Sequence, residues 1–247
     1  MKDVIVITGA GQGLGECIAK ALIANNFRVA ITDISKDKAE AAAKGLSDDS
    51  TIAAGFKLDV TKKADFEQAL SDIEAHFGGV QGLVNNAAMT LTTPVMDVTA
   101  EEFDKVLSVN LRGTLFGCQV FGAYFAEKNY GRIVNMASLA GQNGGTASGV
   151  HYASSKGGII TMTKVFAGHL AGKGVTVNAV APGPMDLPIV RELVPPERLA
   201  HLLDNVIPVK ALGSPDFIGS MVAQLVDRQA FGVTGATWDA NGGLSMR

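Results

Sequence analysis

Short apolar runs alternate along the chain with longer segments whose apolar residues recur every three or four positions. The short runs predict β-strands at residues 4–8, 27–32, 55–60, 83–85, 132–137, 175–180 and 235–238. The longer segments predict helices at residues 13–25, 36–46, 62–77, 100–128 and 152–171. Most of the strands are apolar almost throughout, which is typical of a parallel sheet with both faces covered.

This alternation predicts an α/β fold, namely a single-domain, Rossmann-type, doubly wound parallel sheet with helices on both faces. The chain has 247 residues, and no change of composition or Pro/Gly/Ser-rich linker divides it. We therefore expect one dinucleotide-binding catalytic domain over residues 1–247. A separate substrate domain after Pro182 is the alternative, but the remaining chain is short and ends in another strand-like run.

Composition argues against several classes of function. The net charge is −3 with no run of like charges, so neither nucleic acid nor an anionic membrane is expected as a partner. No apolar run reaches the roughly 18 residues of a membrane span. Cys17 and Cys118 lie in apolar stretches, as buried thiols of a reduced, cytoplasmic protein would. The four histidines lack ligand spacing, so no metal is expected; His151 is assigned a surface or packing role.

A glycine-rich turn follows the first predicted strand. Residues 8–15 fit the pattern T-G-x-x-x-G-x-G, with Gly9, Gly13 and Gly15 at its glycine positions. Glycine lets the backbone approach a ligand closely, and the start of the next helix offers unpaired N–H groups to a pyrophosphate. The turn therefore predicts a phosphate cradle, with a ligand-free glycine turn as the alternative.

Asp33 ends the second predicted strand, twenty residues after Gly13. An acid at this place can bond the ribose hydroxyls of an adenosine and repels a 2′-phosphate. The loop offers Gln12 and no cation that would attract such a phosphate, so we expect NAD rather than NADP. Lys36 and Lys38 are assigned to a solvated helix face; a helix-capping role for Asp33 is the alternative.

Tyr152 and Lys156 are four residues apart in a predicted helix, which puts both side chains on one face. A nearby ammonium lowers the pKa of a phenol from its usual value of about 10. We expect such a shift to make Tyr152 an acid/base for an alcohol or ketone oxygen. Judged by spacing alone, the alternative is that Tyr152 and Lys156 are unrelated residues of one helix.

These motifs, taken together and in order, resemble the short-chain dehydrogenase/reductase family over essentially the whole chain. The segments that carry the resemblance are 8–15, 58–60, 85–88, 108–111, 133–138, 152–156, 181–183 and 239–243. Three features depart from the family pattern: Ala88 stands where a glycine is usual, Leu187 where a threonine is frequent, and Ser138 and Tyr152 are one residue further apart than in many relatives.

The resemblance implies roles for individual residues. The implied catalytic residues are Asn110, Ser138, Tyr152 and Lys156, with Asn110 holding a water that links Lys156 to solvent. The implied cofactor-binding residues are Gly9, Gln12, Gly13, Leu14, Gly15, Asp33, Asp59, Val60, Asn86, Ala87, Tyr152, Lys156, Pro182, Gly183 and Met185. The implied substrate contacts are Ser138, Asn143 and Tyr152, with further contacts from residues 139–146 and from a lid at residues 184–210.

We therefore expect an NAD(H)-dependent oxidoreductase that interconverts a secondary alcohol and a ketone. The apolar lid favours a hydrophobic or aromatic small molecule, although packing onto the body explains it equally well. A 3-oxoacyl-[acyl-carrier-protein] reductase is the alternative enzyme, and an NAD-binding regulatory protein is the non-enzymatic alternative. Relatives in the family pair through the helices at residues 111–124 and 153–170, so a homotetramer or homodimer is expected.

Overall fold

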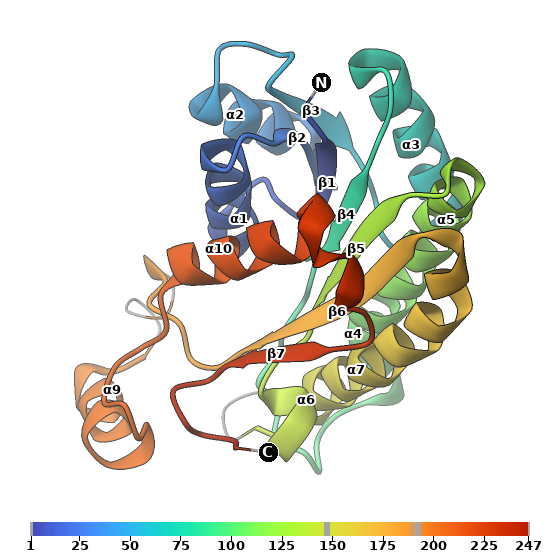
Figure 1. The fold of residues 1–247 in the computed structure, drawn as a ribbon. Helices are drawn as coiled ribbons and strands as arrows, with labels where there is room; N and C mark the ends of the chain where they lie inside the picture. Colours follow the sequence, from blue (N-terminus) through green and yellow to red (C-terminus); the bar gives the residue numbers. More distant parts are fainter. Residues whose placement is uncertain (1, 146–148, 189, 191–193, 247) are drawn as a thin grey trace.

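The computed structural model describes residues 2–145, 149–188, 190 and 194–246. Within them, seven parallel strands form one sheet in the order β3-β2-β1-β4-β5-β6-β7 (Figure 1). The strands are β1 Val4–Thr8, β2 Arg28–Asp33, β3 Ala53–Lys57, β4 Gly82–Asn85, β5 Gly131–Met136, β6 Val175–Pro182 and β7 Thr237–Ala240. The order runs outward in both directions from β1 and β4, which confirms the predicted doubly wound α/β fold.

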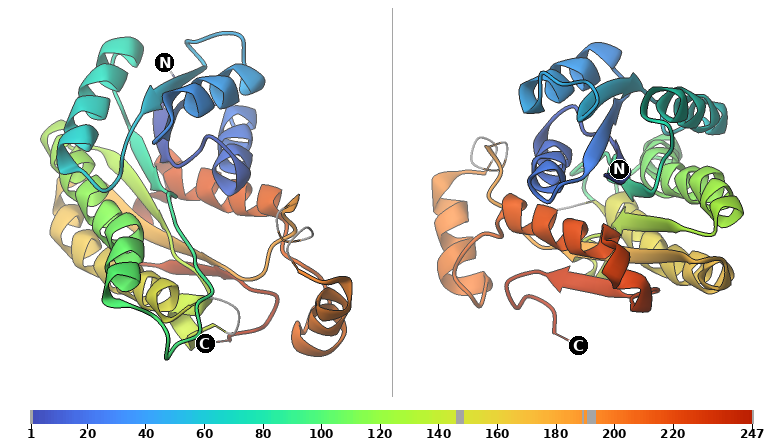
Figure 2. Two further views of the ribbon diagram at one scale, coloured as in Figure 1. Left: turned by 180° about the vertical axis from the view of Figure 1, so that it is seen from behind. Right: turned by 45° about the horizontal axis from the view of Figure 1, so that its top comes forward.

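Helices cover both faces of the sheet (Figure 2). The longer helices are α1 Gly13–Ala24, α2 Lys36–Leu46, α3 Lys63–Phe77, α4 Ala100–Leu107, α5 Gly113–Lys128, α7 Val150–Leu170 and α10 Pro215–Val226. The shorter ones are α6 Ala140–Asn143, α9 Pro196–His201, η1 Ser108–Arg112, η2 Ala171–Lys173, η3 Leu202–Val206 and η4 Arg228–Gly232. Among the described residues, no helix is both long and apolar enough to cross a membrane.

Alternation along the strands divides the core into two layers. Ile5 and Ile7 of β1 belong to an apolar cluster with residues of α1, α2 and α10. Val4 and Val6 of the same strand belong to a second cluster with residues of α3, α5 and α7. All four side chains are fully buried. Because both faces of the sheet are covered in this way, the strands carry apolar residues at successive positions.

Most predicted elements have ends within two residues of those in the structure, and two predictions were wrong by more. The strand expected at residues 55–60 is β3 Ala53–Lys57, because its pairing with β2 ends where Asp33 meets Lys57. The helix expected at 100–128 is interrupted by η1, a π-helical turn around Asn110. The Thr114 hydroxyl donates to the Asn110 carbonyl oxygen at 2.7 Å across this turn. Such π-turns within helices often mark functional sites.

Helix α10 was not predicted, although its start carries clear signals. The Ser214 hydroxyl accepts from the Phe217 amide at 3.2 Å, and Pro215 occupies the first turn. Ile218 and Val222, one turn apart, are buried. The helix packs beside α1 and covers one face of the sheet (Figure 1).

Polar side chains join β4 and β5 near their carboxyl ends. The Asn85 amide donates to Asn135 Oδ1 at 2.8 Å, and the Asn135 amide donates to the Thr163 hydroxyl at 3.0 Å. All three residues are buried. This chain of bonds ties both strand ends to α7, because Thr163 lies on that helix.

Candidate active site

A cavity of about 290 Å³ opens at the carboxyl ends of β1, β4, β5 and β6. Doubly wound sheets bind ligands at this edge, where the strand order changes direction. The cavity is lined by Gly9, Gln12, Gly13, Leu14, Gly15, Asn86, Ala88, Met136, Ala137, Ser138, Tyr152, Lys156, Pro182, Gly183 and Met185. The fold thus brings most of the predicted cofactor residues together with Ser138.

The loop between β1 and α1 lies close against the end of β4. Gly9 has a φ of +61°, and a Cβ atom there would lie 2.7 Å from Ala87 Cα. A Cβ atom at Gly15 would lie 2.6 Å from Ala10 Cα. Both positions therefore require glycine. Gln12 precedes α1 without capping it through its side chain, so the first N–H groups of α1 fit a pyrophosphate in the cavity.

Thr8 and Asn86 hold this loop in place. The Asn86 side-chain amide donates to the carbonyl oxygens of Thr8 at 2.9 Å and Gly9 at 3.1 Å. The Thr8 hydroxyl accepts from the backbone amides of Asn86 and Ala87, both at 3.0 Å. Ala88, which replaces the usual glycine, does not have a positive φ, so its backbone conformation does not require glycine.

Asp33 lies beside the glycine loop at the end of β2. A Cβ atom at Gly11 would lie 2.8 Å from Asp33 Oδ2, while Asp33 Oδ1 accepts from the Ser35 amide at 3.0 Å. Lys38 is exposed, as expected, but it does more than cover a helix face. Its Nζ lies 3.5 Å from Gln12 Oε1, and its Cβ would lie 3.0 Å from a Cβ at Gly11.

Four predicted cofactor residues stand outside the lining of this cavity, namely Asp33, Asp59, Val60 and Ala87. Asp59 Oδ1 accepts from the Thr61 hydroxyl at 2.7 Å and the Thr61 amide at 3.0 Å. Burial raises the Asp59 pKa, but the bonds with Thr61 and Lys62 outweigh it and leave the pKa lowered. Asp59 is thus a carboxylate held by its own turn, and an adenine contact stays a prediction.

Tyr152, Ser138 and Lys156 meet at the far end of the cavity. Tyr152 and Lys156 lie one turn apart on α7, and Lys156 Nζ is 5.5 Å from the centre of the Tyr152 ring. Ser138 follows β5 and lies close enough to the Tyr152 hydroxyl to lower its pKa. Ser138 Oγ accepts from the Ala140 amide at 3.1 Å, so its one proton can be donated either to the Tyr152 oxygen or to a substrate oxygen.

The predicted pKa shift of Tyr152 was wrong in direction for this arrangement. Burial raises the pKa of Tyr152 above 10.0, and the bond from Ser138 offsets this only in part. Lys156 is buried as well, and burial lowers its pKa from 10.5 to about 8. Its Nζ donates to the Met136 carbonyl oxygen at 2.6 Å. A lysine whose own charged form is destabilised gives a neighbouring phenolate less support than an exposed ammonium would.

Asn110 is fully buried behind this group. Its side-chain amide donates to the Met89 carbonyl oxygen at 2.9 Å and to Ser155 Oγ at 3.0 Å, and its Oδ1 accepts from the Met89 amide at 2.7 Å. Asn110 therefore joins the segment after β4 to α7. The water-mediated link to Lys156 stays a prediction.

A second cavity of about 230 Å³ adjoins the first at Ser138, Pro182 and Gly183. Its other lining residues are Leu139, Ala140, Asn143, Gly145, Pro184, Leu202, Val206 and Leu244, none of which carries a charge. Asn143 Oδ1 accepts from the Gly145 amide at 2.9 Å, so the side chain keeps its NH₂ group as a donor. Of the predicted contact segments, residues 146, 189 and 191–193 lie outside the described residues.

Sequence reasoning missed Met136, Ala137 and Leu244 as cavity residues. The position of Met136 and Ala137 at the carboxyl end of β5, just before Ser138, was a usable signal. No sequence signal pointed to Leu244, because its position depends on how the end of the chain folds back. Asn241 sets that fold: its Oδ1 accepts from the Gly243 amide at 3.0 Å, and its amide donates to the Ser245 carbonyl oxygen at 3.0 Å.

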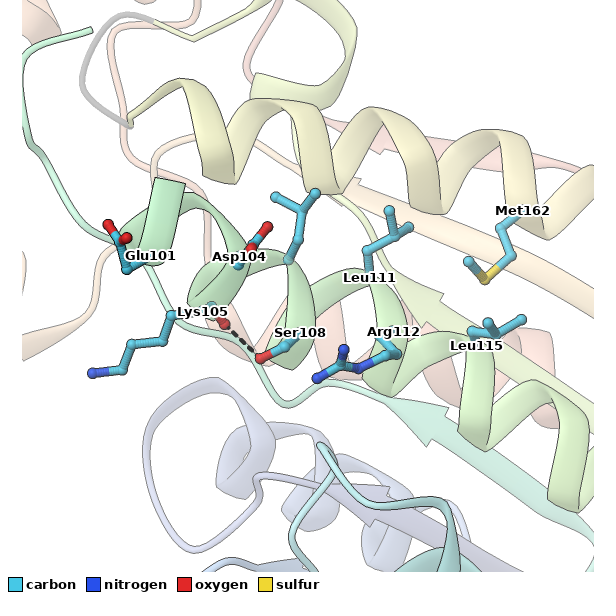
Figure 3. Close-up of a pocket in the computed structure, with 9 residues that line it drawn as sticks. Glu101, Asp104, Lys105, Ser108, Leu111, Arg112, Leu115 and Met162 are labelled. Carbon is cyan, nitrogen blue, oxygen red and sulfur yellow. Dashed lines mark hydrogen bonds between the residues drawn. The ribbon is translucent and has the colours of Figure 1, made fainter. Parts of the chain in front are cut away.

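A larger hollow of about 650 Å³ lies elsewhere, on the outer face of α4, η1, α5 and α7 (Figure 3). Charged side chains from α4 and η1 lie along one part of it and Leu111, Leu115 and Met162 along the other (Figure 3). It contains none of the predicted catalytic or cofactor residues. We therefore place the candidate active site in the two smaller cavities.

Comparison with known proteins gives relatives over almost the whole chain. A family model described as "Enoyl-(Acyl carrier protein) reductase" matches residues 9–245. The chain is 36% identical to 2-(S)-hydroxypropyl-CoM dehydrogenase 3 of Xanthobacter autotrophicus, over 98% of this chain and 96% of the relative. It is 35% identical to the 3-oxoacyl-[acyl-carrier-protein] reductase FabG of Vibrio cholerae, over 98% and 97% of the two chains.

A solved structure is similar throughout. The crystal structure of a short chain dehydrogenase from Bacillus anthracis has a TM-score of 0.88 and 28% sequence identity with this chain. The likeness covers 99% of this chain and 97% of the other. The fold therefore belongs to a known architecture.

Proposed function

The chain belongs to the short-chain dehydrogenase/reductase family of oxidoreductases, and on this premise we propose that it interconverts a secondary alcohol and a ketone with NAD(H). The observation that carries the proposal is the meeting of Tyr152, Ser138 and Lys156 at the junction of the two cavities. When bound, the nicotinamide cofactor accepts or supplies the hydride.

The protein's own part is to hold the substrate oxygen and move one proton. Ser138 donates a hydrogen bond to that oxygen, and Tyr152 takes its proton in oxidation or returns one in reduction. Lys156 bonds the cofactor's ribose and supports the charge that develops on Tyr152. Asn110 positions this helix and a relay water. The uncapped start of α1 and the glycine loop support a role in pyrophosphate binding.

NAD is the favoured cofactor because Asp33 Oδ2 points at Gly11 in the loop, where it would meet ribose hydroxyls and repel a 2′-phosphate. Lys38 is the feature that opposes this choice, since its ammonium reaches Gln12 beside Asp33. The carboxylate lies against the loop backbone at Gly11, whereas the ammonium meets a side chain, and we weigh the carboxylate more heavily.

The substrate we propose is an uncharged hydrophobic or aromatic small molecule. The described walls of the second cavity are apolar apart from Ser138 and Asn143. Asn143 supplies one donor for a second polar group of the substrate. We propose that residues 184–210 act as the lid over this cavity, since Leu202 and Val206 line it.

A 3-oxoacyl-[acyl-carrier-protein] reductase is the second candidate, favoured by the similarity to the Vibrio cholerae enzyme. The absence of charged side chains from the described lining of the second cavity, together with Asp33, weighs against it. A screen separates the two: aliphatic, aryl and steroid ketones and an acetoacetyl thioester, each with NADH and NADPH. Turnover of a simple ketone with NADH supports the proposal. Faster thioester reduction with NADPH would favour the second candidate.

We also propose that two or four copies assemble through the face that holds the 650 Å³ hollow. Leu115 of α5 and Met162 of α7 line that hollow, and Val165 of α7 is 65% exposed, so both helices present apolar side chains to solvent. Light scattering coupled to size exclusion gives the mass. A monomer at micromolar concentration would contradict this part of the proposal.

A further inference from the structure

A buried histidine stands next to the proposed acid/base in the first turn of α7. His151 is fully buried, and its Nδ1 accepts a hydrogen bond from the Tyr152 backbone amide at 2.8 Å. Its Nε2 lies 2.9 Å from Glu102 Oε1 on α4. Because Nδ1 accepts, the ring proton is on Nε2 and is donated to the carboxylate. The imidazole therefore uses both nitrogens.

The first turn of α7 needs such a partner. The residue before the helix is Gly149, which has no side chain to cap the first amide groups. His151 supplies the missing acceptor from within the turn. A side chain at position 149 would collide with the imidazole ring, and the Gly149 amide donates instead to the Leu91 carbonyl oxygen at 3.1 Å.

The carboxylate that anchors the ring is itself fixed. Hydrogen bonds from Thr93 and His151 lower the pKa of Glu102, which keeps it ionised as an acceptor. The Glu102 amide donates to the Thr99 hydroxyl at 3.2 Å, at the start of α4. The ring thus links α7 to a helix that is well separated from it in sequence.

We propose that His151 is a positioning residue: by joining the Tyr152 amide to Glu102, it holds the first turn of α7 so that the Tyr152 hydroxyl meets Ser138. Ser138 follows β5, so the two partners come from different elements and their separation depends on where α7 begins. The kinetic readout rests on the proposed function. A misplacement of about 1 Å in such a site can reduce turnover about a hundredfold.

The test compares three substitutions at one position. His151→Ala removes both bonds and should lower kcat by about ten- to a hundredfold, with KM and the Kd for NADH within about threefold of wild type. His151→Asn places an amide oxygen near the site of Nδ1 and should recover most of kcat. His151→Gln can reach Glu102 but not the Tyr152 amide, and should recover less. His169→Ala, at an exposed place on the same helix, is the matched control.

A spectroscopic measurement does not depend on turnover. The chain has three tyrosines, so Tyr152→Phe assigns the Tyr152 signal in a ¹³C-tyrosine-labelled protein. We expect His151→Ala to move that signal and His151→Asn to restore it. A His151→Ala protein with kcat within twofold of wild type, or with the signal unmoved, would overturn the proposal. A loss of NADH binding in both His151→Ala and His151→Asn would also overturn the proposal. If the Tyr152 signal moves as expected but wild type reduces no ketone in the screen, the result counts against the proposed function alone.

Discussion

Buried polar side chains gather at both ends of the sheet, but the two ends use them differently. At the amino ends of the strands, Arg132 is 3% exposed and makes four bonds. Its guanidinium donates to the carbonyl oxygens of Gly131, Gly174, Asp227 and Arg228 at 2.9 to 3.3 Å. The ring of Tyr130 lies 4.6 Å from this guanidinium and 4.8 Å from that of Arg228.

At the carboxyl ends, the two buried titratable groups Lys156 and Tyr152 have few partners. Lys156 is as buried as Arg132, yet among the described residues its ammonium hydrogen-bonds only the Met136 carbonyl oxygen. Tyr152 has Ser138, and both adjoin open cavities. A charge spread over many fixed acceptors stabilises a fold, whereas a buried titratable group that has few partners and adjoins a cavity can exchange protons with a ligand. We therefore expect the buried charge at the amino ends to stabilise the fold, and the buried groups at the carboxyl ends to take part in the reaction.

The largest effect is expected at the carboxyl end. Tyr152→Phe removes the proton donor and acceptor, and general acid–base catalysis contributes about 10²–10⁴-fold. We expect kcat to fall at least about a thousandfold while the Kd for NADH stays within about twofold, measured by fluorescence titration. Turnover within tenfold of wild type would remove Tyr152 from the proposed role.

At the amino end, the effect should appear in stability alone. Arg132→Met leaves four carbonyl oxygens without their donor, which costs about 3–5 kcal/mol in the free energy of unfolding. Urea titration followed by circular dichroism measures this loss. The kcat per folded molecule should stay within about twofold of wild type, because Arg132 lies at the opposite edge of the sheet. An Arg132→Met protein that keeps the wild-type free energy of unfolding but loses kcat would contradict the comparison.

The pH dependence of stability tests the burial of Lys156. Its pKa is about 8 in the folded protein and 10.5 as its ordinary value. Between these pH values the unfolded chain binds the extra proton, so the free energy of unfolding rises with pH. From pH 8 to about pH 9.5, wild type should gain roughly 2 kcal/mol relative to Lys156→Met. Parallel curves for the two proteins would show that Lys156 titrates normally.

The smallest expected effect concerns the adenosine side. Asp33→Ala removes the carboxylate beside the loop and should raise the ratio of NADPH to NADH efficiency by roughly tenfold, equivalent to about 1.4 kcal/mol. Lys38→Ala is the matched change of opposite sign and should lower that ratio. Wild-type kcat/KM values that are equal for the two cofactors would show that Asp33 does not select NAD.

The sequence alone predicted those parts of the fold that depend on a local pattern of residues. The glycine spacing and the apolar runs placed the strands, α1 and the phosphate loop, because such patterns act over a few residues. The Tyr152 pKa could not be obtained in this way, since it depends on burial and, to a smaller extent, on Ser138. Leu244 reaches the second cavity only because Asn241 folds the chain end back. Contacts of this kind depend on the packed structure.

The most direct test of the central claim follows the hydride itself. Wild type, Arg132→Met and Tyr152→Phe are each incubated with NADH deuterated at C4 and with the ketone that turns over fastest in the screen, and the alcohol is analysed by mass spectrometry. We predict deuterium on the carbinol carbon at similar rates for wild type and folded Arg132→Met, and no detectable product with Tyr152→Phe. Deuterated alcohol formed by Tyr152→Phe at the wild-type rate would contradict the account.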